Sequence, residues 1–234
     1  MHNRFLAHAV NLLREIDEKQ RESIDKASDL MVDTLTKGGI IQAFGAGHSY
    51  AGALELVERA GGLFAVKMIK DPSLGIYETV EGVGNILMRK VEILPEDVVV
   101  IISYSGRNPL CIEIAEAAKK NNAKVIAITS LSASKKLTSR HSSGKLLYQL
   151  ADAVLDLMGV DGDAAIEVEQ LSEKICPASS VAAAAIIQAT VLTTVEKMIA
   201  KGKAPEVRIS ANLDHGLARS LELQKKYAHR IFRI

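Results

Sequence analysis

Apolar residues recur at helical spacing along the first 37 residues, and short apolar runs separated by turns follow. The helical pattern stops at Gly38-Gly39, so we expect one or two amphipathic helices before the first strand. Apolar runs at 40–44 and 63–69, with a helical stretch at 51–60 between them, are typical of a βαβ unit. The pattern therefore predicts a parallel sheet.

The same alternation continues along the chain. It predicts strands at 98–102 and 124–129 and a weaker one at 153–157, and it makes 165–168 a candidate for a further strand. Helices are expected at 79–90, 109–121, 178–200 and 212–230. The third of these should be mostly buried, because Ala, Ile, Val and Leu occupy several of its faces.

No internal repeat, low-complexity tract or linker is visible in the sequence. The simplest interpretation is one three-layer α/β domain that covers residues 1–234. It would carry an N-terminal helical extension at 1–37 and a C-terminal helical tail at 202–234.

Composition excludes several classes of protein. A formal charge of +1 and an aromatic content of 4% without tryptophan argue against nucleic acid or an anionic membrane as partner. Cys111 and Cys176 lack metal-ligand spacing, and no paired histidines or dense carboxylate cluster occurs, so we expect no metal and no cofactor. Neither a signal peptide nor an apolar stretch of about 18 residues is visible. These features predict a soluble cytoplasmic protein with reduced cysteines.

The most informative segment is Ser103-Tyr104-Ser105-Gly106-Arg107-Asn108, which follows an apolar run and precedes a helix. A helix that begins here presents backbone N–H groups and the positive end of its dipole. Ser103, Ser105 and Asn108 add side-chain donors that suit phosphate oxygens. The segment therefore predicts an anion site.

A second glycine turn, Gly45-Ala46-Gly47-His48-Ser49, also follows a strand and opens a helix. Tyr50 stands where a dinucleotide fingerprint has its third glycine, and Lys67 and Lys70 stand where an acid should meet the ribose, so NAD is not expected. Either Gly47 lets a small polar ligand approach the backbone, with Ser49 as a donor, or the glycines only allow tight packing. Two such turns favour the ligand, because ligands in open α/β sheets collect at the carboxyl edge.

These two turns resemble the signature loops of the SIS (sugar isomerase) domain, whose members bind phosphorylated sugars. The resemblance extends to a poorly characterised bacterial subgroup sometimes labelled phosphoheptose isomerases, through the segments 59–62, 127–131, 139–145, 162–164 and 210–214. It implies a five-stranded parallel sheet of flavodoxin-like order, and a homodimer whose ligand sites lie near the subunit interface. It specifies a fold and a phosphosugar ligand, and it specifies no reaction.

The resemblance also assigns roles to residues. The phosphate would be held by Ser103, Ser105, the N–H of Gly106, and Asn108, and the sugar would be contacted at Gly47 and Ser49. Ser179 and Ser180 are expected to cap the helix at 178–200, and the resemblance adds a contact of these hydroxyls with the sugar. The sequence departs from the subgroup in a shortened region at 72–81 and at 215–219, where a run rich in glycine and acid is usual.

Isomerisation of an aldose to a ketose needs a base that moves a proton through an enediol and an acid that helps to open the ring. Glu81 is the favoured base, because its Glu-Gly step resembles a segment of the muramic acid phosphate etherases. Glu55 and Glu58 are its rivals, although a solvated helix face is the simpler explanation of any one glutamate. His141, in the long polar loop 139–145, and His48 are the candidate histidines, and His48 suits the ring-opening acid.

Three functions follow from these residues. The leading hypothesis is an enzyme, an aldose–ketose isomerase that acts on a sugar phosphate or an amino-sugar phosphate. An etherase or lyase acting on an amino-sugar phosphate is the first alternative, motivated by the Glu-Gly step. A non-catalytic phosphosugar-sensing module is the second, motivated by the altered run at 215–219.

Overall fold

Five strands form one parallel sheet in the computed structural model, which describes residues 3–231; the ends of the expected extension and tail, 1–2 and 232–234, lie outside the described residues. The strand order is β2-β1-β3-β4-β5, which confirms the flavodoxin-like order. The order reverses between β1 and β3, and this reversal opens a crevice at the carboxyl ends of those strands. The strands are β1 Ile41–Gly45, β2 Val66–Met68, β3 Val98–Ile102, β4 Lys124–Thr129 and β5 Ala153–Asp156.

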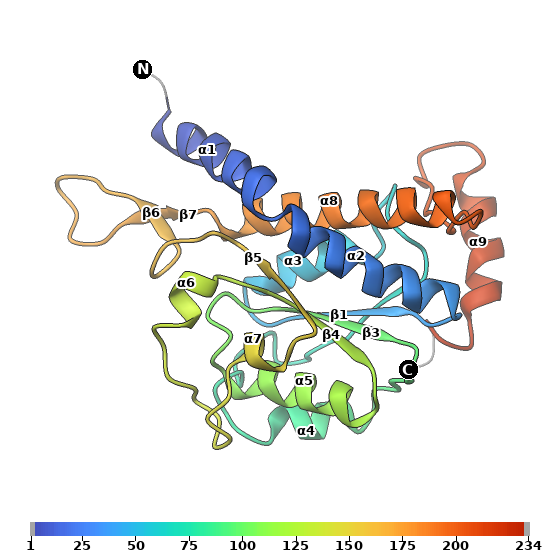
Figure 1. The fold of residues 1–234 in the computed structure, drawn as a ribbon, viewed down its shortest axis with the longest axis horizontal. Coiled ribbons are helices and arrows are strands. Elements are labelled where there is room, and N and C mark those ends of the chain that lie inside the picture. The colour runs from blue at the N-terminus through green and yellow to red at the C-terminus, as the bar shows by residue number, and fades with distance from the viewer. Residues whose placement is uncertain (1–2, 232–234) are drawn as a thin grey trace.

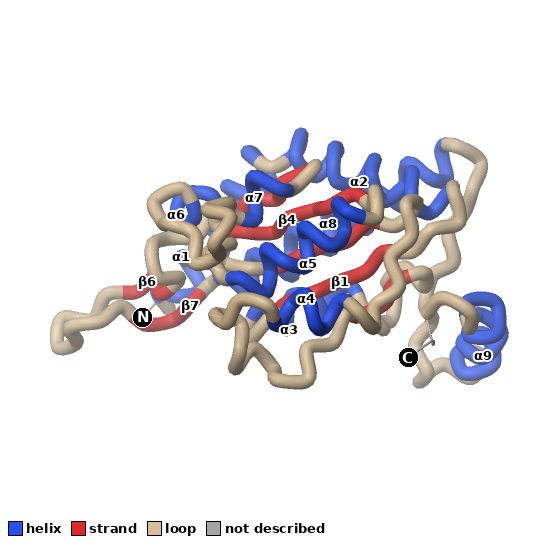
Figure 2. Tube along the Cα trace, turned by 90° about the horizontal axis from the view of Figure 1, so that it is seen from below, coloured by secondary structure: helices blue, strands red, loops and turns tan. Residues whose placement is uncertain are grey.

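Helices cover both faces of this sheet, as Figures 1 and 2 show, so the expected three-layer architecture and N-terminal helix pair are confirmed. One face carries α1 Arg4–Lys19, α2 Arg21–Thr36, α3 Ser49–Leu56 and α8 Ser179–Ala200, and the other carries α4 Val83–Met88, α5 Pro109–Lys120 and α7 Leu147–Leu150. A short helix, α6 Leu131–Ser134, follows β4.

The position of β3 in the middle of the sheet explains why its sequence is an unbroken apolar run. Val98, Val100 and Ile102 belong to the core under α2 and α8, whereas Val99 and Ile101 belong to the core under α5. All five residues are buried, because helices cover the sheet on both sides.

Helix α8 differs from the expectation of a mostly buried helix. By length and composition alone it could cross a membrane, so the expectation that the chain has no apolar stretch of about 18 residues is wrong for this helix. Only 39% of its most apolar window is buried. Its inner side, which includes Ile186 and Ile187, packs into the core, while Leu192 and Ile199 are 58% and 59% exposed. Within the chain, therefore, α8 keeps an uncovered apolar side.

Several predicted elements are shorter than their apolar patterns. The helix predicted at 51–60 ends at Leu56, and Glu58 follows with a positive φ of 57°. The strand predicted at 63–69 is reduced to β2, because Leu63 instead forms an antiparallel bridge with Val207 in the tail. The helix predicted at 79–90 is reduced to α4, since Gly82 at its start has a φ of +96°, which helices do not accommodate.

The candidate strand near 165–168 is not part of the main sheet. It appears as β6 Ala164–Ile166, which pairs with β7 Ile175–Pro177 in an antiparallel hairpin. This hairpin projects from the body of the molecule beside the start of α1 (Figure 1).

The C-terminal tail packs against the sheet far from the hairpin, and it includes α9 Gly216–Tyr227 (Figure 1). The backbone N–H of Phe64 donates to the carbonyl of Glu206 at 2.9 Å, and the Arg208 guanidinium lies 4.3 Å from the centre of the Phe64 ring. The Arg230 side chain, 8% exposed, donates to Asp97, which precedes β3. The tail therefore lies at the amino ends of the strands.

Candidate functional site

Two loops at the carboxyl ends of β1 and β3 line a cavity of about 290 Å³. The cavity lies where the strand order reverses, which is the edge at which the sequence predicts a ligand. The first loop contributes Ala46, Gly47, His48 and Ser49, and the second contributes Ser103, Tyr104, Ser105 and Asn108. The wall is completed by Gly52, Glu78, Ile102, Leu157, Asp163, Ser179, Ser180 and Ala183.

Glycines shape the first loop. A side chain at Gly45 would place its Cβ 2.2 Å from the carbonyl oxygen of Ser49, so the tight turn into α3 requires glycine there. Gly75 also lies against the backbone of the first loop, since a Cβ at that position would lie 2.5 Å from the backbone nitrogen of Gly47. The segment that contains Gly75 therefore packs on the first loop, and it brings Glu78 to the cavity.

Gly106 braces the second loop from beneath. Its N–H donates to the hydroxyl of Ser103 at 3.2 Å, and its carbonyl accepts from the N–H of Leu147 at 2.8 Å. Gly106 is buried with a φ of +60°, and it does not line the cavity. The structure thus places this predicted phosphate contact under the loop rather than on its surface.

The amino end of α5 offers fewer free donors than the sequence suggests. Pro109, its first residue, has no N–H, and the N–H of Leu110 donates to the carbonyl of Glu78 at 3.2 Å. The donors that reach the cavity from this loop are therefore mainly side chains, those of Ser103, Ser105 and Asn108.

A residue distant in sequence satisfies the first free N–H group of α8. Ala178 occupies the N-cap position, so the prediction that Ser179 and Ser180 cap this helix is wrong. The carboxylate of Asp163 accepts from the N–H of Ser179 at 3.0 Å and from its hydroxyl at 2.5 Å. Asp163, Ser179 and Ser180 all line the cavity, which is where the predicted sugar contact of the two serines requires them to lie.

Several polar groups on the wall have no partner of their own. Within residues 3–231 the hydroxyls of Ser49, Ser105 and Ser180 make no hydrogen bond, and the carboxylate of Glu78 makes neither a hydrogen bond nor an ion pair. Such groups are available to a polar ligand. The sequence prediction missed Glu78 and Asp163, because both lie in irregular segments with no periodicity. In the sequence, Gly75 and Gly82 on either side of Glu78 are the local indication that this segment packs closely against another segment.

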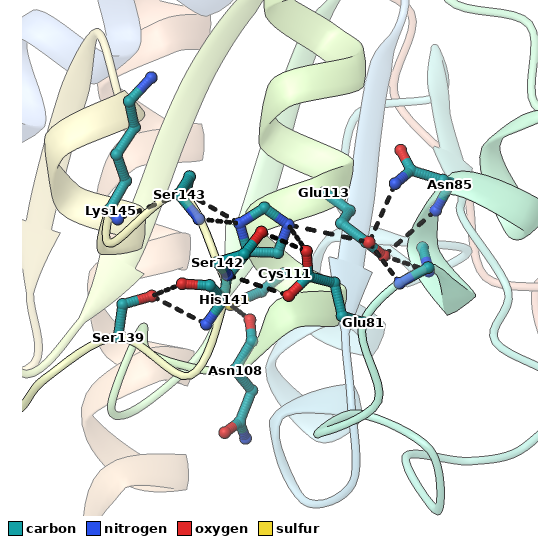
Figure 3. A network of polar contacts seen from close by, with 12 residues as sticks. Glu81, Asn85, Asn108, Cys111, Glu113, Ser139, His141, Ser142, Ser143 and Lys145 are labelled. Atoms are coloured by element: carbon teal, nitrogen blue, oxygen red, sulfur yellow. Dashed lines mark hydrogen bonds and ion pairs between the residues drawn. The ribbon is translucent and has the colours of Figure 1, made fainter.

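Glu81 and His141 lie together outside the cavity. The Glu81 carboxylate accepts from the N–H of Ser142 at 2.9 Å and from the Ser142 hydroxyl, and these two bonds hold the pKa of Glu81 below its usual value. Nε2 of His141 lies 3.5 Å from Glu81 and 3.9 Å from Glu113 (Figure 3). The structure therefore brings these two predicted residues to each other, and it does not bring them to the cavity.

Glu113, on α5, is fully buried and anchors this cluster. Its carboxylate accepts from the N–H groups of Gly82 at 2.5 Å and Gly84 at 2.6 Å, at the amino end of α4. Glu55 lies elsewhere, on α3, where its carboxylate accepts from Arg59 at 3.0 Å and Gln188 at 3.3 Å. Its rival Glu58 does not line the cavity either. Of the predicted catalytic residues, only His48 lies on the cavity wall.

Within residues 3–231, no group of three or more His, Cys, Asp or Glu side chains is placed so that it could hold a metal ion. The polar groups on the cavity wall include serine hydroxyls, the Asn108 amide and the carboxylates of Glu78 and Asp163. These groups suit a small, polar, hydroxylated anion.

The chain is similar to several known proteins. Residues 4–130 match the SIS domain family. A UPF0309 protein of Listeria monocytogenes is 47% identical over 230 residues, which cover 98% of both chains. A UPF0309 protein of Shouchella clausii is 38% identical over 230 residues, or 94% of both chains.

Two solved structures share the fold. A phosphoheptose isomerase from Neisseria gonorrhoeae has a TM-score of 0.55 at 20% identity and covers 81% of this chain and 92% of its own. A phosphoheptose isomerase from Francisella tularensis has a TM-score of 0.56 at 16% identity and covers 81% of this chain and 94% of its own. At these identities the likeness establishes the fold alone.

Proposed function

This chain belongs to the UPF0309 family of SIS domain proteins, and on that premise we propose that its cavity binds a sugar phosphate and isomerises it. One observation carries the proposal. Five serine side chains, from three separate segments, meet an unpaired carboxylate on a single small cavity at the carboxyl edge of the sheet. Hydroxyl donors suit phosphate and sugar oxygens, and the carboxylate suits a base.

The proposed ligand lies with its phosphate on the second loop. Ser103, Ser105 and Asn108 donate to the phosphate oxygens there, and the charge of the ligand makes each such bond stronger than a neutral one. The sugar extends toward Ser49 on the first loop and toward Ser180 at the start of α8.

Glu78 is the proposed base and His48 the proposed ring-opening acid, since both line the same cavity. The Glu78 carboxylate takes a proton from the carbon next to the carbonyl of the open-chain sugar, and the carbonyl oxygen is protonated to give an enediol. The proton on Glu78 exchanges with solvent before Glu78 returns a proton to the neighbouring carbon. The second hydroxyl becomes the new carbonyl as it gives its proton back to the acid that protonated the first carbonyl oxygen. The aldose and the ketose are isomers with the same atoms and the same number of electrons, so the reaction needs no oxidant, reductant or other cofactor.

A panel of sugar phosphates and amino-sugar phosphates incubated with the protein in deuterated water tests the reaction. We expect deuterium at the carbon beside the carbonyl for at least one ligand, seen by proton NMR. Tight binding without exchange would instead support a sensing module. Release of lactate from muramic acid phosphate would support an etherase, although Glu81, which motivated that alternative, lies outside the cavity.

Substitution of Ser105 by alanine tests the phosphate position. We expect the affinity for the bound sugar phosphate to fall by about 1–3 kcal/mol, because one hydrogen bond to a charged group is lost. Isothermal titration calorimetry measures the change. Ser172→Ala, on the projecting hairpin, is a matched control and should bind as the unchanged chain does. Equal affinity in the two variants would mean that the second loop does not hold the phosphate.

We also propose a cytoplasmic homodimer. Leu6 and Val10 on α1, and Leu192 and Ile199 on α8, are exposed apolar side chains, and each pair has the spacing of one helix face. A second copy that covers these faces would bury them. Light scattering after gel filtration should give twice the mass of one chain, and cell fractionation should place the protein with the cytosol. A single-chain mass, or recovery outside the cytosol, would contradict the corresponding part.

A further inference from the structure

One arginine outside the cavity contacts a residue on its wall. Nη1 of Arg140 donates to the side-chain oxygen of Asn108 at 3.0 Å. Asn108 is 8% exposed and lines the cavity, whereas Arg140 is exposed and does not line it. The contact therefore joins the loop at 139–145 to the loop on which the phosphate is proposed to lie.

This contact determines which end of the Asn108 amide meets a ligand. A guanidinium can only donate hydrogen bonds, so the amide atom that faces Arg140 must be the oxygen. The amide nitrogen, which has no partner within residues 3–231, is then left for the cavity. The two orientations of an amide have nearly the same shape and opposite polarity: nitrogen toward the cavity attracts an anion, and oxygen repels it.

Backbone hydrogen bonds hold Arg140 in place. Its N–H donates to the carbonyl of Arg107 at 2.9 Å, and the N–H of Leu147 donates to the carbonyl of Gly106 at 2.8 Å. The loop at 139–145 is thus tied to the phosphate loop at both of its ends.

The cluster of Glu81, His141 and Glu113 holds the middle of the same loop. Glu81 accepts from Ser142, and His141 faces both carboxylates (Figure 3). Since Glu113 is itself fixed by the amino end of α4, the loop cannot shift without breaking these contacts. In the same view the Asn108 amide is turned away from this cluster, and so is the side chain of Lys145.

We propose that Arg140 is a positioning residue that holds the Asn108 amide with its nitrogen toward the cavity, and so makes the site selective for anions. This inference rests on the proposed phosphate site. It assigns a function to the polar loop at 139–145, which does not line the cavity. Arg140 acts through Asn108 and does not contact the ligand.

A double-mutant cycle with inorganic phosphate as the probe tests the inference. The dissociation constant is measured by NMR titration for the unchanged chain, Arg140→Met, Asn108→Ala and the double variant. We expect Arg140→Met to weaken phosphate binding about tenfold, because the Asn108 amide is no longer held in place and its hydrogen bond to the charged phosphate is lost. In the Asn108→Ala background the same substitution should have no effect.

Two further variants separate positioning from loss of charge. Arg140→Lys keeps a donor for the Asn108 oxygen and should restore most of the affinity. Lys145→Met removes one positive charge from the same loop and should leave binding unchanged. In the unchanged chain phosphate should shift the side-chain amide protons of Asn108, and in Arg140→Met this shift should be lost.

Equal effects of Arg140→Met in both backgrounds would show that Arg140 acts through its own charge, and would overturn the inference while leaving the phosphate site intact. A comparable loss for Lys145→Met would overturn it in the same way. If the unchanged chain does not bind phosphate at Ser105, both the inference and the proposed function fail.

Discussion

Replacing Glu78 by glutamine is expected to slow deuterium exchange into the bound sugar phosphate by about 10²–10⁴-fold, the usual contribution of a general base. Glutamine has nearly the same shape but takes up no proton at neutral pH. Because the Glu78 side chain makes no hydrogen bond or ion pair within residues 3–231, the substitution should leave the fold and the affinity for the ligand nearly unchanged. Exchange followed by proton NMR at saturating ligand measures the loss.

Glu81→Gln is the matched control for this experiment. Glu81 stands three residues further along the chain, yet its carboxylate is bonded to Ser142 and does not line the cavity. Exchange should therefore continue at close to the original rate in this variant. Loss of exchange in Glu81→Gln with normal exchange in Glu78→Gln would reverse the assignment of the base.

Replacing Arg230 by methionine is expected to lower the free energy of unfolding by about 3–5 kcal/mol, the cost of leaving a buried charge without its partner. Nη2 of Arg230 lies 2.6 Å from the carboxylate of Asp97, which is fully buried. Asp97 also accepts from the N–H groups of Ile40 and Leu94, both at 2.9 Å, so it cannot turn toward solvent without breaking the starts of β1 and β3. Urea denaturation followed by circular dichroism, at one fixed protein concentration, measures the change.

An exposed ion pair in the same tail provides the comparison. Arg219 and Glu222 lie 2.7 Å apart with side chains 39% and 68% exposed. Arg219→Met should cost no more than about 1 kcal/mol, since solvent screens such pairs. A loss for Arg230→Met as small as that for Arg219→Met would mean that Asp97 does not depend on the tail.

The strands were predictable because their evidence is local. Each residue of β3 is apolar and buried, and β4 is apolar and buried from Val125 to Ile128, so their apolar runs alone mark strands covered on both faces. Element ends were less predictable, because contacts between distant segments set them. Leu63 pairs with Val207 in an antiparallel bridge instead of extending β2, and no sequence pattern near Leu63 predicts that bridge.

The candidate site divides in the same way. Ser49, Ser103 and Ser105 could be placed at this edge from sequence, since each lies within four residues of the end of a strand whose carboxyl end must face it. Gly106 lies in the same loop, but its role in bracing the loop depends on contacts with Ser103 and Leu147. Neighbours along the chain can therefore differ in whether they face a ligand.

By itself, the sequence determined the α/β fold and the edge of the sheet at which two polar loops meet, because hydrophobic periodicity and strand-to-helix turns act over a few residues. Only the tertiary structure decided that Glu78 faces the cavity while Glu81 and His141 face Glu113, and that Asp163 caps α8. Those choices depend on how an irregular segment packs against elements far away in the chain, and irregular segments carry no period from which their orientation could be deduced.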